Sequence, residues 1–142
     1  MLISTRTRYG LRAILDLALH YSGKPVFLKD IALREGISRR YLENIFTKLR
    51  TAGILKSSKG RGGGFCLARD PAHINLLDII EVLENNLAFS SCTEDPSSCE
   101  RQEKCISREA WVSINESFKN SLDSITIADL IKNHARKNLV SV

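Results

Sequence analysis

Three of the four cysteines lie close together in the second half of the sequence, where they are candidates for metal binding or redox chemistry. Cys92, Cys99 and Cys105 are separated by six and five residues, whereas structural zinc sites usually contain C-x-x-C pairs. Thiolates also hold iron–sulfur clusters, in which another ligand can replace a cysteine. The spacing therefore leaves open an iron–sulfur cluster, a zinc ion, or free and redox-active thiols. Cys66 lies in an apolar segment, where a buried and inert thiol is expected.

Positive charge is concentrated in the first half of the chain. Residues 1–70 contain 14 Lys and Arg against 5 Asp and Glu, a net charge of +9, whereas residues 71–142 contain 7 against 11, a net charge of −4. This asymmetry favours a polyanionic partner such as DNA or RNA for the first half, and a solvated basic surface is the alternative. No Ser/His/Asp or Cys/His arrangement and no phosphate-binding loop is present, so the sequence does not predict an enzyme.

A helix that begins after Ser38 is the strongest candidate for reading a nucleic acid. Its apolar residues recur at helical spacing, so one face is expected to be buried. The opposite face offers polar residues near the helix N-terminus, the part of a recognition helix that contacts base edges. These residues are Ser38, Arg39, Arg40, Tyr41, Glu43, Asn44 and, further along, Lys48. Glu43 either accepts a hydrogen bond from a cytosine amino group or forms a surface ion pair with Arg39 or Arg40.

The next segment predicts a β-hairpin with a cationic tip. Two short apolar runs, at residues 54–58 and 65–68, flank a glycine-rich turn that contains Lys59 and Arg61. Such a thin ribbon can enter a minor groove, where cations meet a negative potential; a flexible surface turn is the alternative. Four further cations are expected to bind phosphate rather than to read sequence. They are Arg6, Arg8, Lys29 and Arg50.

The order of the predicted elements is that of a winged helix-turn-helix followed by a long helix. Helices are expected at residues 5–21, 28–35, 38–52, 76–83, 106–122 and 126–131. The fold class is therefore mainly α with a small β-hairpin wing. Three parts are expected: a DNA-binding domain at 1–84, a cysteine-rich loop at 85–105, and a C-terminal part at 106–142. No run of about 18 apolar residues and no secretory signal is present, so no membrane contact is expected and the cytoplasm is the expected location.

Several short motifs together resemble the Rrf2-type family of bacterial winged-helix transcriptional regulators. The likeness extends from residue 1 to about residue 132. It is carried by Arg8-Tyr9-Gly10, Gly36-Ile37-Ser38, Tyr41-Leu42-Glu43, Leu49-Arg50, Ala52-Gly53-Ile54-Leu55 and Gly60-Arg61-Gly62-Gly63-Gly64-Phe65. The three clustered cysteines place the chain nearest the IscR-, NsrR- and RirA-like branch, whose members bind iron–sulfur clusters.

This resemblance implies a homodimeric repressor or dual regulator that binds a double-stranded DNA operator. It implies that the long helix at 106–122 joins the two copies through Trp111, Ile114 and Phe118. It also implies a [2Fe-2S] or [4Fe-4S] cluster on Cys92, Cys99 and Cys105 that senses iron, redox state or nitric oxide. Arg108 stands where IscR-like members carry a histidine. The fourth ligand is therefore open between an external small ligand and the carboxylates of Asp95, Glu100, Glu103 and Glu109.

Two alternative functions follow from the same residues. The first is a DNA-binding regulator of this family without a cluster, which uses thiol oxidation, zinc or a partner protein. The second is a winged helix that docks on a protein instead of DNA. Metal analysis distinguishes the first alternative, and the salt dependence of duplex binding distinguishes the second.

Overall fold

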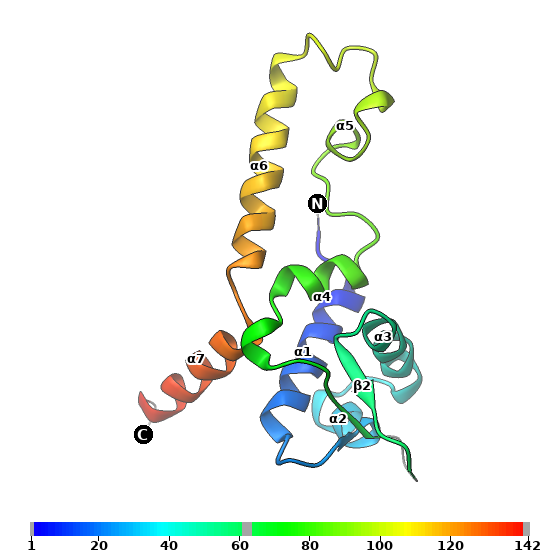
Figure 1. Ribbon diagram of the computed structural model, residues 1–142, viewed down its shortest axis with the longest axis vertical. Coiled ribbons are helices and arrows are strands. Elements are labelled where there is room, and N and C mark those ends of the chain that lie inside the picture. Colours follow the sequence, from blue (N-terminus) through cyan, green and yellow to red (C-terminus); the bar gives the residue numbers. More distant parts are fainter. Residues whose placement is uncertain (1, 61–63, 141–142) are drawn as a thin grey trace.

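A computed structural model describes residues 2–60 and 64–140 of the chain. In this part of the chain, four helices and a small sheet form a base, a long helix rises from it, and a last helix projects sideways (Figure 1). The helices of the base are α1 (Thr5–His20), α2 (Leu28–Glu35), α3 (Arg39–Thr51) and α4 (Leu76–Leu83). The remaining helices are α5 (Ser91–Glu94), α6 (Ile106–Asp123) and α7 (Ile127–Val140).

Side-chain caps begin the helices at the positions that the sequence predicts. The Ser4 hydroxyl accepts from the Thr7 amide at 3.2 Å, and the Ser38 hydroxyl accepts from the Tyr41 amide at 3.2 Å. Asn75 and Asp78 form a reciprocal capping box at the start of α4. Each such cap contributes about 1 kcal/mol. Gly36 ends α2 in the left-handed conformation, with φ of 64°. The predicted boundaries of α1 to α4 agree with the structure to within one residue.

The sheet contains one more strand than the predicted hairpin. Strands β2 (Leu55–Ser57) and β3 (Gly64–Leu67) form that hairpin, and β1 (Val26–Phe27) pairs with the other edge of β3. A strand of two residues is too short for a periodic signal, so the sequence did not reveal it. The close approach of β1 depends on Gly64, because a Cβ atom there would lie 2.6 Å from the Cβ of Pro25.

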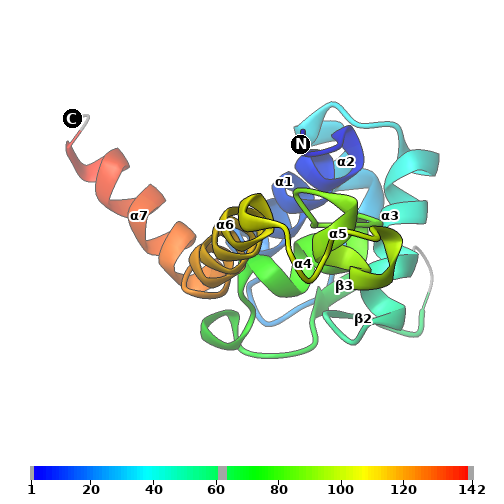
Figure 2. The ribbon, with the colours of Figure 1, turned by 90° about the horizontal axis from the view of Figure 1, so that it is seen from above.

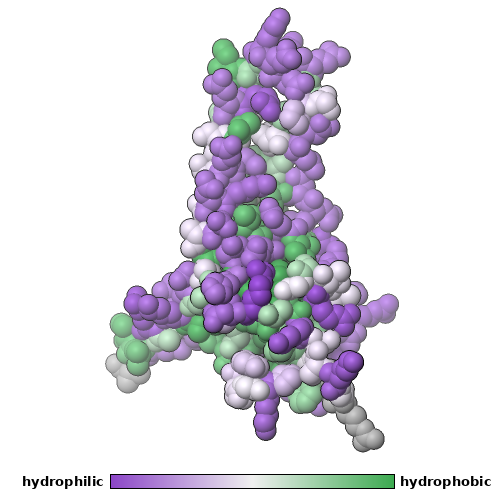
Figure 3. Space-filling view, viewed as in Figure 1, coloured by the Kyte–Doolittle hydropathy of each residue, from purple (hydrophilic) through white to green (hydrophobic). Residues whose placement is uncertain are grey.

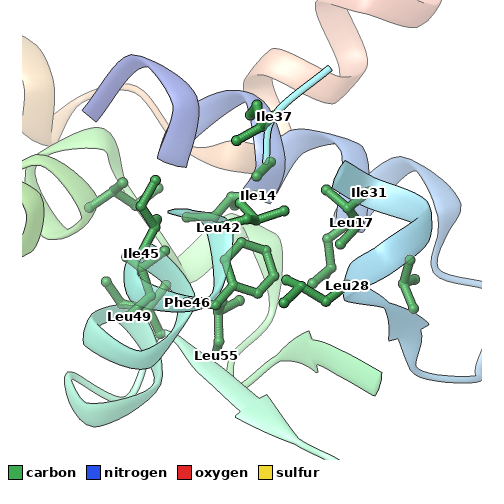
Figure 4. Packing of buried hydrophobic residues seen from close by; sticks show 14 of the residues in the cluster. Ile14, Leu17, Leu28, Ile31, Ile37, Leu42, Ile45, Phe46, Leu49 and Leu55 are labelled. Atoms are coloured by element: carbon green, nitrogen blue, oxygen red, sulfur yellow. The ribbon is translucent and has the colours of Figure 1, made fainter. Parts of the chain in front are cut away.

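The core lies where α1, α2, α3 and the sheet meet, and α3 supplies its centre (Figure 4). Phe46 packs edge-on against Phe65, with ring centroids 5.1 Å apart. The whole predicted stripe of α3 is fully buried: Leu42, Ile45, Phe46 and Leu49. Burying one such side chain stabilises the fold by roughly 1.5–3 kcal/mol, so this stripe fixes which face of α3 points outward.

The second half of the chain differs from the sequence prediction in two places. The segment at 85–105 contains α5 and a 3₁₀ turn at Pro96–Ser98, so it is not a loop without structure. Helix α7 continues to Val140, whereas the sequence predicts that it ends at Ile131. The extension agrees with the absence of glycine and proline after that residue. Seen from above, α7 points away from the side that carries α2 and α3 (Figure 2). None of the described helices is both long and apolar enough to cross a membrane.

Candidate nucleic-acid interface and cysteine loop

The outward face of α3 brings together most of the residues that the sequence analysis assigned to base reading. Their side chains project from the face opposite the buried stripe. The exposed members are Ser38, Arg39, Arg40, Glu43, Asn44 and Lys48. Tyr41 is half-buried, because its ring packs edge-on against the Tyr9 ring of α1 at 6.0 Å between centroids. A rigid helix therefore presents two guanidiniums, a carboxylate and an amide from its first turns.

Glu43 forms a surface ion pair with Arg39, which is one of the two roles that the sequence left open for it. Arg39 Nε lies 3.2 Å from Glu43 Oε1, and the two side chains are 58% and 51% exposed. Exposed pairs of this kind contribute about 0–1 kcal/mol. This ion pair can therefore be exchanged for contacts with a ligand at little cost, and base reading by Glu43 stays a prediction.

Helix α1 holds α2 in place behind this face. Asp16 is buried and accepts from Arg34 through both oxygens, at distances of 2.6–3.1 Å. The hydrogen bond to Asp16 raises the pKa of Arg34, so the guanidinium stays charged. A bidentate pair of this kind fixes orientation as well as distance. It ties the first helix of the helix-turn-helix to α1.

The hairpin tip lies only partly within the described residues. Lys59 is exposed, whereas Arg61 lies outside the described residues. Arg50 at the end of α3 reaches the hairpin, with Nη1 3.5 Å from the Ser57 hydroxyl. Cys66 is half-buried and pairs with Lys56 across the strands, so the expectation of a buried thiol was wrong. Successive side chains of a strand point to opposite faces, and Phe65 and Leu67 pack against the core, so Cys66 lies on the opposite face of β3.

The two N-terminal cations that were predicted to bind phosphate have different surroundings. Arg8 is exposed, and its guanidinium donates to the hydroxyl of Thr5 on its own helix at 3.0 Å. Arg6 is half-buried, and its Nε donates to the Leu83 carbonyl at the end of α4 at 2.7 Å. A phosphate contact stays a prediction for both residues, and Arg8 is the better placed of the two.

The three clustered cysteines are free thiols spread along the segment that rises from the base, beside α6, to the start of that helix (Figure 1). Cys92 Sγ lies 3.1 Å from the Ser90 hydroxyl, and Cys105 Sγ lies 3.1 Å from the Ser107 hydroxyl. The contact with Ser107 lowers the pKa of the Cys105 thiol. Within the described residues, no three His, Cys, Asp or Glu side chains gather into a metal-binding group. The thiols suit an iron–sulfur cluster in type, but their arrangement in this structure does not fit one.

Helix α6 packs only loosely against the rest of its own chain. None of its 18 residues is buried. Trp111 and Ile114 are each 43% exposed, whereas Phe118 packs edge-on against Phe89 of the same chain at 5.4 Å. Apolar side chains accordingly reach the surface in patches along the upright part of the molecule (Figure 3).

A helix-turn-helix with a cationic outer face, followed by a β-hairpin, defines a winged-helix DNA-binding protein. The profile of the family described as "Rrf2: Iron-dependent Transcriptional regulator" matches residues 3–133. The chain belongs to this family. It is a DNA-binding transcriptional regulator and not an enzyme, and members of the family commonly act as dimers.

Individual relatives cover nearly the whole chain. The protein rrf2 of Nitratidesulfovibrio vulgaris is 39% identical over 93% of this chain and 88% of its own length. The regulator IscR of Xenorhabdus nematophila is 35% identical over 94% of this chain and 80% of its own. Among solved structures, T. potens IscR superposes with a TM-score of 0.75 at 40% identity, covering 94% of this chain and 88% of its own. CymR, the global cysteine regulator of B. subtilis, has a TM-score of 0.76 at 38% identity, covering 94% of this chain and 98% of its own.

Sequence reasoning missed the contacts by which α1 holds the helix-turn-helix. Arg12 reaches Glu35 across 23 positions of sequence, and Arg34 reaches Asp16 across 18. No spacing within one helix identifies such pairs. The sequence offers one hint: Arg12 and Asp16 lie four residues apart on one helix, and residues 34 and 35, which carry the opposite charges, lie at the end of the next.

Proposed function

We propose that this regulator binds a two-fold symmetric DNA operator as a homodimer and represses transcription there. Each copy places α3 in a major groove and the hairpin tip, with Lys59 and Arg61, at the adjacent minor groove. The observation that carries this proposal is the exposed face of α3, with Arg39, Arg40 and Asn44 above a fully buried stripe. Arg pairs with guanine and Asn with adenine at base edges. Because the proposed partner is chromosomal DNA, we place the protein in the cytoplasm.

The proposed dimer contact is the exposed side of α6. Most of the stability of a helix in a protein comes from the packing of its apolar face, and no residue of α6 is fully buried within its own chain, although Phe118 packs on Phe89. A second copy that covers Trp111 and Ile114 would supply the missing burial. Phe118 would then continue the same face, one helical turn further on. We therefore propose that the chain has three parts: a DNA-binding part at 1–84, a cysteine-rich segment at 85–105 and a dimerisation part at 106–142.

We further propose that Cys92, Cys99 and Cys105 bind an iron–sulfur cluster, [2Fe-2S] or [4Fe-4S], through which the regulator senses iron, redox state or nitric oxide. The support is the donor set of three half-buried thiols on one segment and the similarity to IscR proteins. Binding requires the segment to change its conformation so that the three Sγ atoms come together. The CymR structures favour the alternative of a regulator without a cluster, in which the thiols act by oxidation.

The DNA proposal is tested by the salt dependence of duplex binding. A duplex selected by the protein from a randomised pool is compared with a scrambled duplex of the same composition. If a dimer contacts about six phosphates, affinity for both should fall roughly a thousandfold between about 50 and 200 mM salt. The selected duplex should bind more tightly at every salt concentration. No measurable binding to either duplex at low salt would instead favour a winged helix that docks on a protein.

The cluster proposal is tested by colour and metal content. Protein reconstituted anaerobically with iron and sulfide should absorb visible light through sulfur-to-iron charge transfer. Changing Cys92, Cys99 and Cys105 to alanine should abolish this absorption and the bound iron. The matched control is Cys66→Ala, which removes the fourth thiol and should leave the spectrum unchanged. Colour that survives in the triple variant would refute the ligand assignment, and zinc in place of iron would favour the alternative metal.

A further inference from the structure

Arg12 contacts the last residue of α2 in two ways. Its Nε donates to Glu35 Oε2 at 2.9 Å, and its Nη2 donates to the Glu35 backbone carbonyl at 2.6 Å. The last carbonyls of a helix have no partner within the helix, so the second contact satisfies a group that would otherwise need water. Glu35 directly precedes Gly36, where the turn of the helix-turn-helix begins. Arg12 therefore holds the entry to that turn.

The guanidinium of Arg12 is also linked to the start of α3, through the ring of Tyr9. Its central carbon lies 5.5 Å from the centre of the Tyr9 ring, at a distance that favours a cation–π interaction. The Tyr9 ring in turn packs at 89° against Tyr41. Tyr41 belongs to the first turn of α3, and its amide donates to Ser38. One side chain of α1 thus contacts the end of α2 directly and the start of α3 through a single aromatic ring.

We propose that Arg12 is a positioning residue that sets the angle of α3 and thereby determines operator specificity without contacting DNA. The proposal rests on the proposed DNA function. The turn at residues 36–38 contains a glycine with φ of 64°, so it constrains the angle between the helices less than a run of bulkier residues would. Base reading requires that several side chains of α3 meet their partners together, and a small rotation weakens all of them. Phosphate contacts tolerate such a rotation, because they depend on charge more than on direction.

Arg8 provides a matched control one helical turn away. It is also an exposed arginine on α1, but it bonds only within its own helix. Arg12→Gln should lower the ratio of affinities for the selected and scrambled duplexes about tenfold, the size of one mismatched base pair. The dependence of affinity on salt should not change. Arg8→Gln should instead weaken both duplexes equally and reduce the slope of log K against log salt by about 1.8, because each copy of the dimer loses one phosphate contact worth about 0.9. Arg12→Lys should also lose discrimination, because an ammonium cannot make both contacts and stack on Tyr9.

The outcomes separate the two proposals. Arg12→Gln that weakens both duplexes equally, or Arg12→Lys that restores the full ratio, would overturn the positioning role and make Arg12 one more phosphate contact. If Arg12→Gln does not fold, as judged by circular dichroism, Glu35→Gln replaces it. That variant weakens the side-chain contact, retains the carbonyl contact, and should lose discrimination to a smaller degree; an unchanged ratio would overturn the proposal. Wild-type protein that does not prefer the selected duplex would refute the DNA function itself.

Discussion

Neutralising the three arginines that we propose to contact the two DNA grooves should weaken operator binding at least about a hundredfold. Each base pair read by a well-placed side chain is worth about 1–3 kcal/mol, and every 1.4 kcal/mol is about a factor of ten. The variant carries Arg39→Gln, Arg40→Gln and Arg61→Gln. Loss of Arg39 also leaves the carboxylate of Glu43 without its ion-pair partner, so repulsion from phosphate adds to the loss. Fluorescence anisotropy with the selected duplex measures the effect.

A control with the same change in net charge separates contact from general electrostatics. Lys119→Gln, Lys132→Gln and Arg136→Gln remove three cations from α6 and α7. Because both helices belong to the proposed dimerisation part, the oligomeric state of this variant is measured beside that of the wild type, and it should be unchanged. Helix α7 projects away from the side that carries α3 (Figure 2), so these changes should weaken binding no more than a few-fold. Equal losses in the two triple variants, or no loss in the first, would contradict the placement of α3 against DNA.

Replacing Gly10 by valine should destabilise the fold by about 3 kcal/mol. Gly10 is buried in α1 at the point where α3 and α4 approach each other. A Cβ atom at this position would collide with Leu83 Cδ1 and lie 3.2 Å from Ile45 Cγ2. Leu83 and Ile45 are themselves fully buried, so neither can move without disturbing the core. Urea denaturation followed by circular dichroism gives the free energy of unfolding.

The same substitution at an exposed position of α1 controls for the helix propensity of valine. Arg8→Val should cost less than about 0.7 kcal/mol. Ile45 belongs to α3, so Gly10→Val is also expected to lower operator affinity at temperatures where the variant is still folded. A Gly10 variant as stable as the wild type would mean that α1, α3 and α4 are not in such close contact.

Local chemistry was enough to predict six of the helices, the hairpin and their order, whereas β1 and α5 were too short for a periodic signal. Ser38 caps α3 and Gly36 ends α2 because a hydroxyl and a left-handed glycine act within two or three residues of their position. The buried stripe of α3 follows from the helical period, which an eleven-residue window contains in full. The exposed polar face of α3 was predictable for the same reason, since the face opposite a buried stripe points outward. The family resemblance depends on the same short motifs.

Tertiary structure decided which side chains meet across the chain. The pairing of β1 with β3, the contact of Arg12 with Glu35 and the use of Arg6 on the Leu83 carbonyl join residues 23 to 77 positions apart. The exposure of Cys66 and the packing of Phe118 on Phe89 also depend on neighbours that no local pattern specifies. The period of a helix or strand is written in adjacent residues, whereas a long-range contact depends on how all the elements pack together. For this reason, the sequence alone determined a winged helix with a basic face, and only the folded chain determined how α1 holds it.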